Sequence, residues 1–261
     1  MQSIRRRLTS IAAIAILGAA VAIIIPASGV AAASRYTCMG GSIPGGSYGS
    51  VLVKGPCTVD AGTVTVAHQF IVGKSGELLA AFGSSNLRVA GSLVVRSKGI
   101  LVLGCEPDAF PCLDDPTLTT NEWVGGDLLV RGALASIVHH TRIGHSLYQL
   151  NGGGGVNCDS QPALQGSPYY GTYEDVNVGG NVTIVGMHSC WLGLIRTHVA
   201  GSVFYSNNVM ADPDANEVVT NVIGGDLVCT GNSPAPQVGD STGNLNVVGH
   251  MALFQCAGLT V

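Results

Sequence analysis

Histidines are the first side chains of this sequence that could hold a metal ion. His139 and His140 are adjacent, and His145 follows five residues after the pair. Neighbouring side chains of an extended chain point to opposite faces, so at most one of the pair can join His145, and no carboxylate adjoins them in sequence. We therefore interpret the histidines as surface or corner residues, and we predict neither a metal site nor a cofactor.

Acidic residues form a second candidate metal site between Asp212 and Glu217. Their order resembles the first half of a helix-loop-helix calcium loop. Such a loop needs glycine at its sixth position and a carboxylate at its twelfth, where this chain has Glu217 and Ile223. That motif is therefore absent. A looser oxygen-ligand site, here or in the acidic segment 108–115, is the alternative to solvated loop carboxylates.

The sequence gives little support for catalysis. Glycan cleavage needs two carboxylates about 5–10 Å apart on one groove, or calcium-binding acids beside a Lys or Arg that takes a proton. The exported part of the chain has only three lysines and six arginines, and none forms a row beside clustered acids. No Gly-x-Ser-x-Gly elbow of the hydrolase kind precedes a helix. We therefore predict no catalytic residue.

Cysteines are the clearest chemical signal. All eight lie after residue 33: Cys38, Cys57, Cys105, Cys112, Cys158, Cys190, Cys229 and Cys256. An even count outside the cell indicates four disulfides, although sequence alone leaves their connectivity open. Pairs of nearest neighbours suit a solenoid best: they close both ends, a loop rich in Pro and Asp, and a long glycine-rich loop. A metal site is the rival interpretation, but no Cys-x-x-Cys spacing occurs.

A repeated five-residue phrase positions all of these side chains. It consists of an aliphatic residue, a small residue, glycine, a polar residue and an aliphatic residue. Copies start at Val89, Val124, Ile143, Val178, Val199, Ile223 and Val247, and the copy at Ile143 reads as slipped because His145 replaces its glycine. Aliphatic first and fifth columns suit inward strand residues, and the fourth column should face water. Glycine in the third column marks a corner with positive φ or a close backbone.

Phrases repeated at a spacing near twenty residues predict a solenoid. We predict an all-β chain, a right-handed parallel β-helix, because nearly all parallel crossovers are right-handed. Its ends are stapled by disulfides, and loop insertions leave it at about 104–121 and 151–173. The predicted domains are a secretory signal peptide at 1–33 and a single β-helix domain at 34–261.

Two sets of residues could bind a ligand. The residues just before each phrase should form an outward ladder: Arg88, Trp123, Arg142, Asn177, His198, Val222 and Asn246. Trp123 and Arg142 could bind a glycan by stacking and hydrogen bonding, against the alternative of a solvated strand face. The second set is Tyr169, Tyr170 and Tyr173 in the longer insertion. These rings either form a binding surface or pack back and cover the coil, and we leave both alternatives open.

Targeting and charge restrict the partners. A basic start, an apolar run from Ile11 to Ile25 and small residues before Ser34 predict export and signal cleavage. No apolar tail ends the chain, so we expect no transmembrane anchor after cleavage. Removing the three arginines of the signal leaves nine basic side chains against sixteen acidic ones, which disfavours nucleic acid as a partner.

The chain resembles a group of secreted actinobacterial β-helix proteins of unknown function. The resemblance rests on the opening from Thr37 to Val59, the repeated phrase, and the ending from Cys229 to Leu259. It implies the β-helix fold and export, and it carries over no catalytic residue. We expect a secreted, non-catalytic structural or binding element at the cell envelope, with a cell-wall or extracellular glycan or another envelope protein as partner. A β-helical polysaccharide lyase or glycoside hydrolase is the alternative.

Overall fold

The computed structural model describes residues 34–239 and 243–261, which form a parallel β-helix of three sheets. The predicted export segment lies outside the described residues. Sheet A contains β1 (Arg35–Cys38), β4 (Ser50–Val53), β7 (Phe70–Val72), β10 (Leu93–Val95), β13 (Leu128–Ala133), β16 (Leu147–Gly152), β19 (Val182–Ser189), β22 (Val203–Ser206), β26 (Leu227–Thr230), β28 (Ala252–Phe254) and β23 (Val209–Met210), which pairs with β19.

The other two sheets alternate with sheet A along the chain. Sheet B contains β2 (Gly41–Ser42), β5 (Pro56–Thr58), β8 (Glu77–Ala80), β11 (Ile100–Leu103), β14 (Ala135–His139), β17 (Gly171–Glu174), β20 (Leu192–Ile195) and β24 (Glu217–Val219). Sheet C contains β3 (Gly46–Tyr48), β6 (Gly62–Val66), β9 (Ser85–Val89), β12 (Glu122–Val124), β15 (Thr141–Ile143), β18 (Asn177–Val178), β21 (His198–Val199), β25 (Val222–Ile223) and β27 (Val247–Val248). One short 3₁₀ segment, η1 (Pro162–Leu164), lies in the longer insertion.

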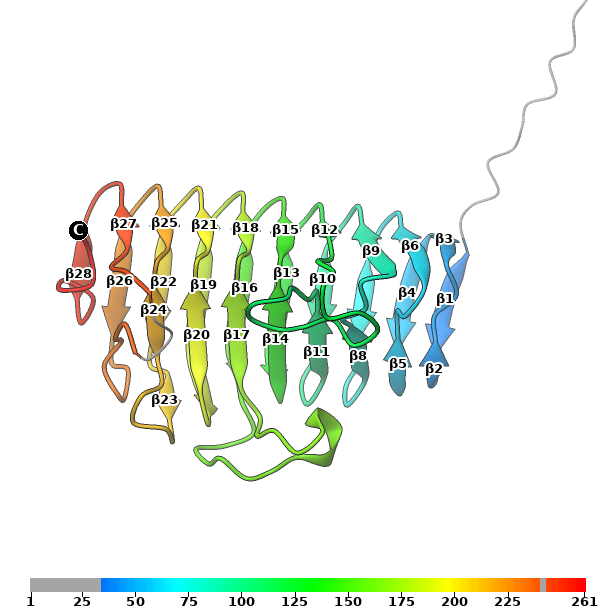
Figure 1. The fold of residues 1–261 in the computed structure, drawn as a ribbon, viewed down its shortest axis with the longest axis horizontal. Helices are drawn as coiled ribbons and strands as arrows, with labels where there is room; N and C mark the ends of the chain where they lie inside the picture. Colours follow the sequence, from blue (N-terminus) through cyan, green and yellow to red (C-terminus); the bar gives the residue numbers. More distant parts are fainter. Residues whose placement is uncertain (1–33, 240–242) are drawn as a thin grey trace, which may run out of the picture. The chain divides into compact units, whose positions relative to one another are not determined.

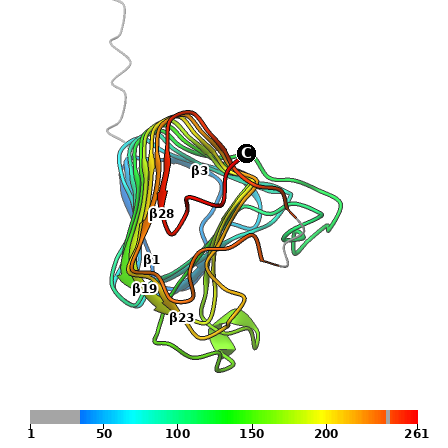
Figure 2. The same ribbon diagram turned by 90° about the vertical axis from the view of Figure 1, so that its left-hand side faces the viewer.

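Most coils add one strand to each of the three sheets, and all pairs between the named strands are parallel. Figure 1 shows the strands stacked along the long axis, and Figure 2 shows successive coils superposed when viewed down that axis. The phrase spans the corner from sheet C to sheet A, where Val124 pairs with Ile143 and Leu128 pairs with Leu147. The copy at Ile143 is therefore in register, and the interpretation of it as slipped was wrong.

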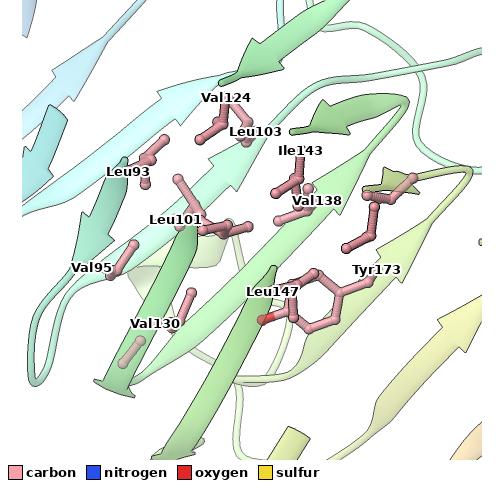
Figure 3. Close-up of a cluster of buried hydrophobic side chains, with 14 of the residues drawn as sticks. Leu93, Val95, Leu101, Leu103, Val124, Val130, Val138, Ile143, Leu147 and Tyr173 are labelled. Atoms are coloured by element: carbon pink, nitrogen blue, oxygen red, sulfur yellow. The ribbon is translucent and has the colours of Figure 1, made fainter. Parts of the chain in front are cut away.

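The first and fifth columns of the phrase point into the coil, as predicted. Val124, Leu128, Ile143 and Leu147 are all buried. Figure 3 shows three of them, Val124, Ile143 and Leu147, inside the coil with inward residues of sheet B such as Leu101 and Val138. The last copy differs, because Val248 pairs with Ile223 and takes the first column. The prediction was one residue out there, so Val247 continues the outward ladder and Asn246 is buried.

The glycines of the third column make room for the side chain of the coil before. A Cβ on Gly180 would lie 2.5 Å from Oγ of Ser146, and one on Gly225 would lie 2.3 Å from Oγ of Ser202. Neither glycine has a positive φ. Of the two predicted reasons for glycine, close approach is therefore the one that holds.

The fourth column was expected to face water, but it also stabilises the corner. The Ser146 amide donates to a carboxylate oxygen of Asp127 at 3.0 Å, and the amide of Asn181 donates to the Ser146 hydroxyl oxygen at 3.1 Å. The same kind of hydrogen bond, from a backbone amide to the fourth-column side chain of the preceding coil, repeats along the stack from Ser92 to Met251. Each polar side chain thus satisfies an amide that no strand ladder reaches.

Buried polar rows stabilise the other two corners. The amide of Thr197 donates to Asn221, whose own amide donates to Asn246. At the corner between sheets A and B, the side chain of Asn208 accepts from the amide of Met187, and Asn232 accepts from the amide of Asn208. Neither row was predicted, because an asparagine at a corner looks the same in the sequence whether its side chain faces the core or the solvent.

The four disulfides join nearest neighbours in the chain, which was the predicted pairing. Cys38–Cys57 closes the first coils and Cys229–Cys256 closes the last ones. Cys105–Cys112 and Cys158–Cys190 belong to the two insertions. The ends and the insertions are the parts that cannot bury a face between two neighbouring coils.

The corner at Asp127 and Leu128 tests this register. Leu128→Ala should lower the free energy of unfolding by about 2–5 kcal/mol because it opens a cavity in the coil. Asp127→Ala should cost about 1 kcal/mol because the Ser146 amide loses its acceptor, whereas Asp127→Ser keeps an acceptor and should cost less. Urea denaturation of the three variants measures the order. An equal loss for Asp127→Ala and Asp127→Ser would contradict the amide role.

Candidate functional site

The outer face of sheet B is apolar and covered, unlike an ordinary solvated face. Ile100, Val102 and Ile137 point outward from β11 and β14, yet they are 4%, 5% and 2% exposed. They form a second hydrophobic cluster that is separate from the interior of the coil. Residues from both insertions pack on this cluster, so the insertions supply the cover that the strands need.

The first insertion, 104–121, leaves sheet B after β11. The Asp114 carboxylate accepts hydrogen bonds from the amides of Gly83 and Ser84 at 2.6 and 2.9 Å, and the Cys105–Cys112 disulfide closes the loop. Phe110 packs against the outer cluster. The disulfide therefore closes the loop on itself, and Asp114 and Phe110 attach it to the coil, with Phe110 over the sheet.

The second insertion runs from Gly153 to Tyr170 and is tied down by Cys158–Cys190. The carbonyl oxygen of Tyr169 accepts from the Ser189 hydroxyl at 2.7 Å, and the Tyr170 ring lies edge-on to Trp191. Burial, and to a lesser extent the charge of Glu174, raises the pKa of Tyr170 to about 12. Tyr169 and Tyr170 thus pack on the outer face of sheet B, and Tyr170 also lines a cavity there.

Tyr173 is a correction to the predicted site. It lies inside the coil and is fully buried, with its hydroxyl 2.8 Å from the side-chain oxygen of Gln149 and 3.0 Å from Ser136. Strand alternation explains the error, because β17 turns Thr172 and Glu174 outward and leaves Tyr173 pointing inward. Tyr173 is therefore a core residue.

A cavity of about 430 Å³ lies between the two insertions and sheet B. Its floor is formed by Leu79, Ile100, Val102 and Ile137, and its apolar walls by Phe110, Pro111, Leu113, Ala163, Leu164 and Tyr170. Thr58, Gln165 and Ser167 also line it, and Glu77 is the one charged residue among the lining residues that the structure describes. The volume is in the range of about 300–1,000 Å³ of small-molecule sites.

A buried charged cluster adjoins the cavity, and Phe110 belongs to both. The Phe110 ring stacks on His139 at 4.9 Å, and His139 Nδ1 lies 3.4 Å from Glu106 and 3.8 Å from Glu174. Burial, reinforced by neighbouring Asp175, raises the pKa of Glu106 to about 7. Burial also lowers the pKa of His139 to about 4, although nearby carboxylates oppose this.

The rest of the cluster is internally paired. Arg196 donates to Asp175 at 2.6 Å and to Glu174 at 3.1 Å. Among the residues that the structure describes, no three His, Cys, Asp or Glu side chains are arranged to hold a metal ion. The cluster therefore places Glu106 of the first insertion against His139, and its two half-buried acids, Glu174 and Asp175, are both paired with one arginine.

The predicted ladder on sheet C is present. Trp123 lies directly between Arg88 and Arg142, followed by Asn177 and His198. The Arg88 guanidinium sits 6.0 Å from the centre of the Trp123 ring. Beside the ladder, Arg142, Asn177 and His198 line an open groove of about 560 Å³. Trp123 and Arg142 lie on sheet C, whereas the tyrosines lie on or within sheet B of neighbouring coils, so the predicted residues do not form one site.

Among the lining residues of the cavity, Tyr170 was predicted to bind a ligand. The floor was not predicted as part of a site, although the sequence carries a signal for it. Ile100–Leu103 is an uninterrupted aliphatic run, and such a run indicates a strand buried on both faces. This run was not singled out among the strands expected from the sequence. Two apolar faces beside two long insertions would have pointed to this cavity.

Comparison with known proteins gives no relative: no protein-family model, no curated protein and no solved structure matches this chain. Fold and site geometry therefore carry the functional argument. In the described part of the chain, none of the elements is a helix long and apolar enough to cross a membrane.

A fully buried acid, Glu122, also affects how stability depends on pH. Its side chain lies inside the coil, where one oxygen accepts from the amide of Leu87 and the other has no hydrogen-bond partner. Burial raises the pKa of Glu122 to about 8, although the Leu87 amide and the charge of Arg88 oppose the shift. The folded chain thus holds this carboxyl protonated at neutral pH.

These shifts predict that stability falls as the pH rises from 6.5 to 8. Glu106 and Glu122 bind their protons more tightly in the folded chain, so their contribution is lost between the unfolded value of 4.5 and about 7 and 8. The opposite contribution of His139 is gained between about 4 and 6.5 and is constant above that. We expect a loss of about 1–2 kcal/mol over the window in urea denaturation.

Glu122→Gln is the matched variant, because an amide keeps the acceptor for Leu87 and does not titrate. Its stability should fall less between pH 6.5 and 8 than that of the parent. A parent whose stability is flat or rises across this window would contradict the protonated state of both acids.

Proposed function

We propose that this protein is an exported, non-catalytic β-helix that binds an apolar ligand outside the cell, in the cavity on sheet B. The observation that supports the proposal is the convergence of two separate insertions on one cavity. The two insertions leave different coils, each is closed or tied by a disulfide, and each contributes apolar walls to the cavity.

Preorganisation supports the same conclusion. A solenoid is rigid along its sheets, and the disulfides and backbone hydrogen bonds hold both insertions in place before any ligand arrives. The insertions are then already ordered in the free protein, so ligand binding loses little further conformational entropy. Contacts with an apolar ligand therefore contribute more fully to its affinity. The four disulfides and the predicted signal are consistent with an extracellular setting.

A glycan chain bound along sheet C is the second candidate. Its support is the open groove beside Arg142, Asn177 and His198, which follows the coil axis with one ladder residue per coil. A glycan array distinguishes the candidates, because Arg142→Ala should abolish glycan binding and leave the sheet B cavity unchanged.

Glycan cleavage is the catalytic alternative, and its support is Glu106, a carboxyl with a raised pKa close to Glu174. The arrangement favours anchoring over catalysis, because Arg196 pairs with Glu174 and Phe110 stacks against His139. We expect neither new reducing ends nor unsaturated products when polysaccharides are incubated with the protein. Turnover that Glu106→Gln removes would overturn the non-catalytic proposal.

Blocking the cavity tests the proposed function. Ala163→Trp places a large ring at the exposed rim without entering the core, and it should weaken binding of the neutral apolar dye Nile red at least about tenfold. Ala67→Trp, at an exposed corner between sheets C and A, is the control and should bind as the parent does. Fluorescence titration measures both. Parent protein that fails to bind the dye, or equal binding by the two variants, would contradict the proposal.

A further inference from the structure

Basic side chains gather at one corner of the coil. The corner between sheets A and B carries five of the nine basic residues after residue 33: Lys54, Lys74, Arg96, Lys98 and Arg131. All five are exposed, and none forms an ion pair within the part of the chain that the structure describes. An acidic protein thus has an unpaired positive row, which we call the basic corner.

Successive coils place these residues in line. The amide of Gly73 donates to Val53 at 2.8 Å, and that of Arg96 donates to Val72 at 2.9 Å, so the turns after β4, β7 and β10 stack directly. Stacked turns of a β-helix are about 4.8 Å apart. At that spacing, several cations can contact the same small anion or neighbouring oxygens of one head group.

The basic corner borders the sheet B cavity. Lys54 stands two residues before Pro56, and Lys98 stands two residues before Ile100, and both Pro56 and Ile100 line the cavity. Two residues span at most about 7 Å, which is within reach of a lysine side chain. Glu77, between Pro56 and Ile100 in the sheet, is the opposing charge at this edge.

The cations are confined to the coils that form the cavity. The same corner in later coils, residues 153–170, 190–191, 207–216 and 231–236, contains no lysine or arginine and carries Asp159, Asp212 and Asp214. The cavity floor comes from β8, β11 and β14, which follow the basic turns directly. General solubility would not require this coincidence of charge and cavity.

We propose that the ligand of the sheet B cavity is an anionic amphiphile, with its apolar chain in the cavity and its carboxylate or phosphate on Lys54, Lys74 and Lys98. The proposal rests on the proposed function and adds the chemical class of the ligand. An apolar floor selects the chain, and the cations at its edge favour a negative head group over a neutral or positive one.

Ligands that share one chain and differ in head group test the proposal. Laurate, dodecyl maltoside and dodecyltrimethylammonium are titrated below their micelle concentrations at low salt, with Nile red displacement as the measurement. We expect laurate to bind at least about tenfold more tightly than the other two. Its advantage should shrink with added salt, because exposed charges are screened.

Charge variants locate the head group. Lys54→Gln with Lys98→Gln should weaken laurate binding about tenfold and leave dodecyl maltoside unchanged. Arg35→Gln with Arg88→Gln makes the same change in net charge on sheets A and C and should leave both ligands unchanged. Glu77→Gln should tighten laurate binding, since it removes the opposing charge.

The possible failures are distinguishable. If Nile red and all three ligands fail to bind, the proposed function is wrong. Two outcomes would contradict only the claim that the ligand has an anionic head group. In the first, Nile red binds but laurate binds no more tightly than the other two ligands. In the second, both double variants weaken laurate binding equally. Laurate binding that depends on the lysines but not on Ala163→Trp would identify a surface anion patch, and it would overturn the amphiphile assignment.

Discussion

The backbone amides at the corners are the constraint on which this structure depends. Strands of a parallel β-helix pair with the coils above and below, but the chain leaves the ladder at each corner, and a buried amide without an acceptor is costly. At the corner between sheets C and A, where the amides are part-buried or exposed, the side chains of the fourth column accept hydrogen bonds from them from coil to coil. Buried asparagines do the same at the other corners.

This constraint explains why glycine and a polar residue occur together in the phrase. The oxygen that satisfies an amide reaches forward from the previous coil, and it occupies the space that a Cβ at the third column would need. Glycine removes that Cβ, and the polar residue that follows provides the acceptor for the next coil. His145 shows that the third column tolerates a side chain where Asp127 still reaches the Ser146 amide.

The regular part of the fold was therefore predictable, and the irregular part was not. The columns fixed the inward positions of Leu128 and Leu147, and the insertions and the disulfide pairs followed from spacing. Tyr173 and Asn246 were misplaced because alternation could not be counted across an insertion or the last corner, where one residue more or less reverses the face. The cavity was missed because covering loops act across space and have no period of their own.

The disulfides show the same division between the regular coils and their additions. A coil in the middle of the stack buries its apolar residues against two neighbours and needs no covalent tie. The terminal coils have one neighbour each, and the insertions have only the outer face of sheet B. In these parts, fewer contacts offset the conformational entropy that the chain loses on folding. Cross-links that restrict the unfolded chain therefore contribute most to stability there. All four bridges lie in these two kinds of place, so the walls of the cavity are held as firmly as the ends of the coil.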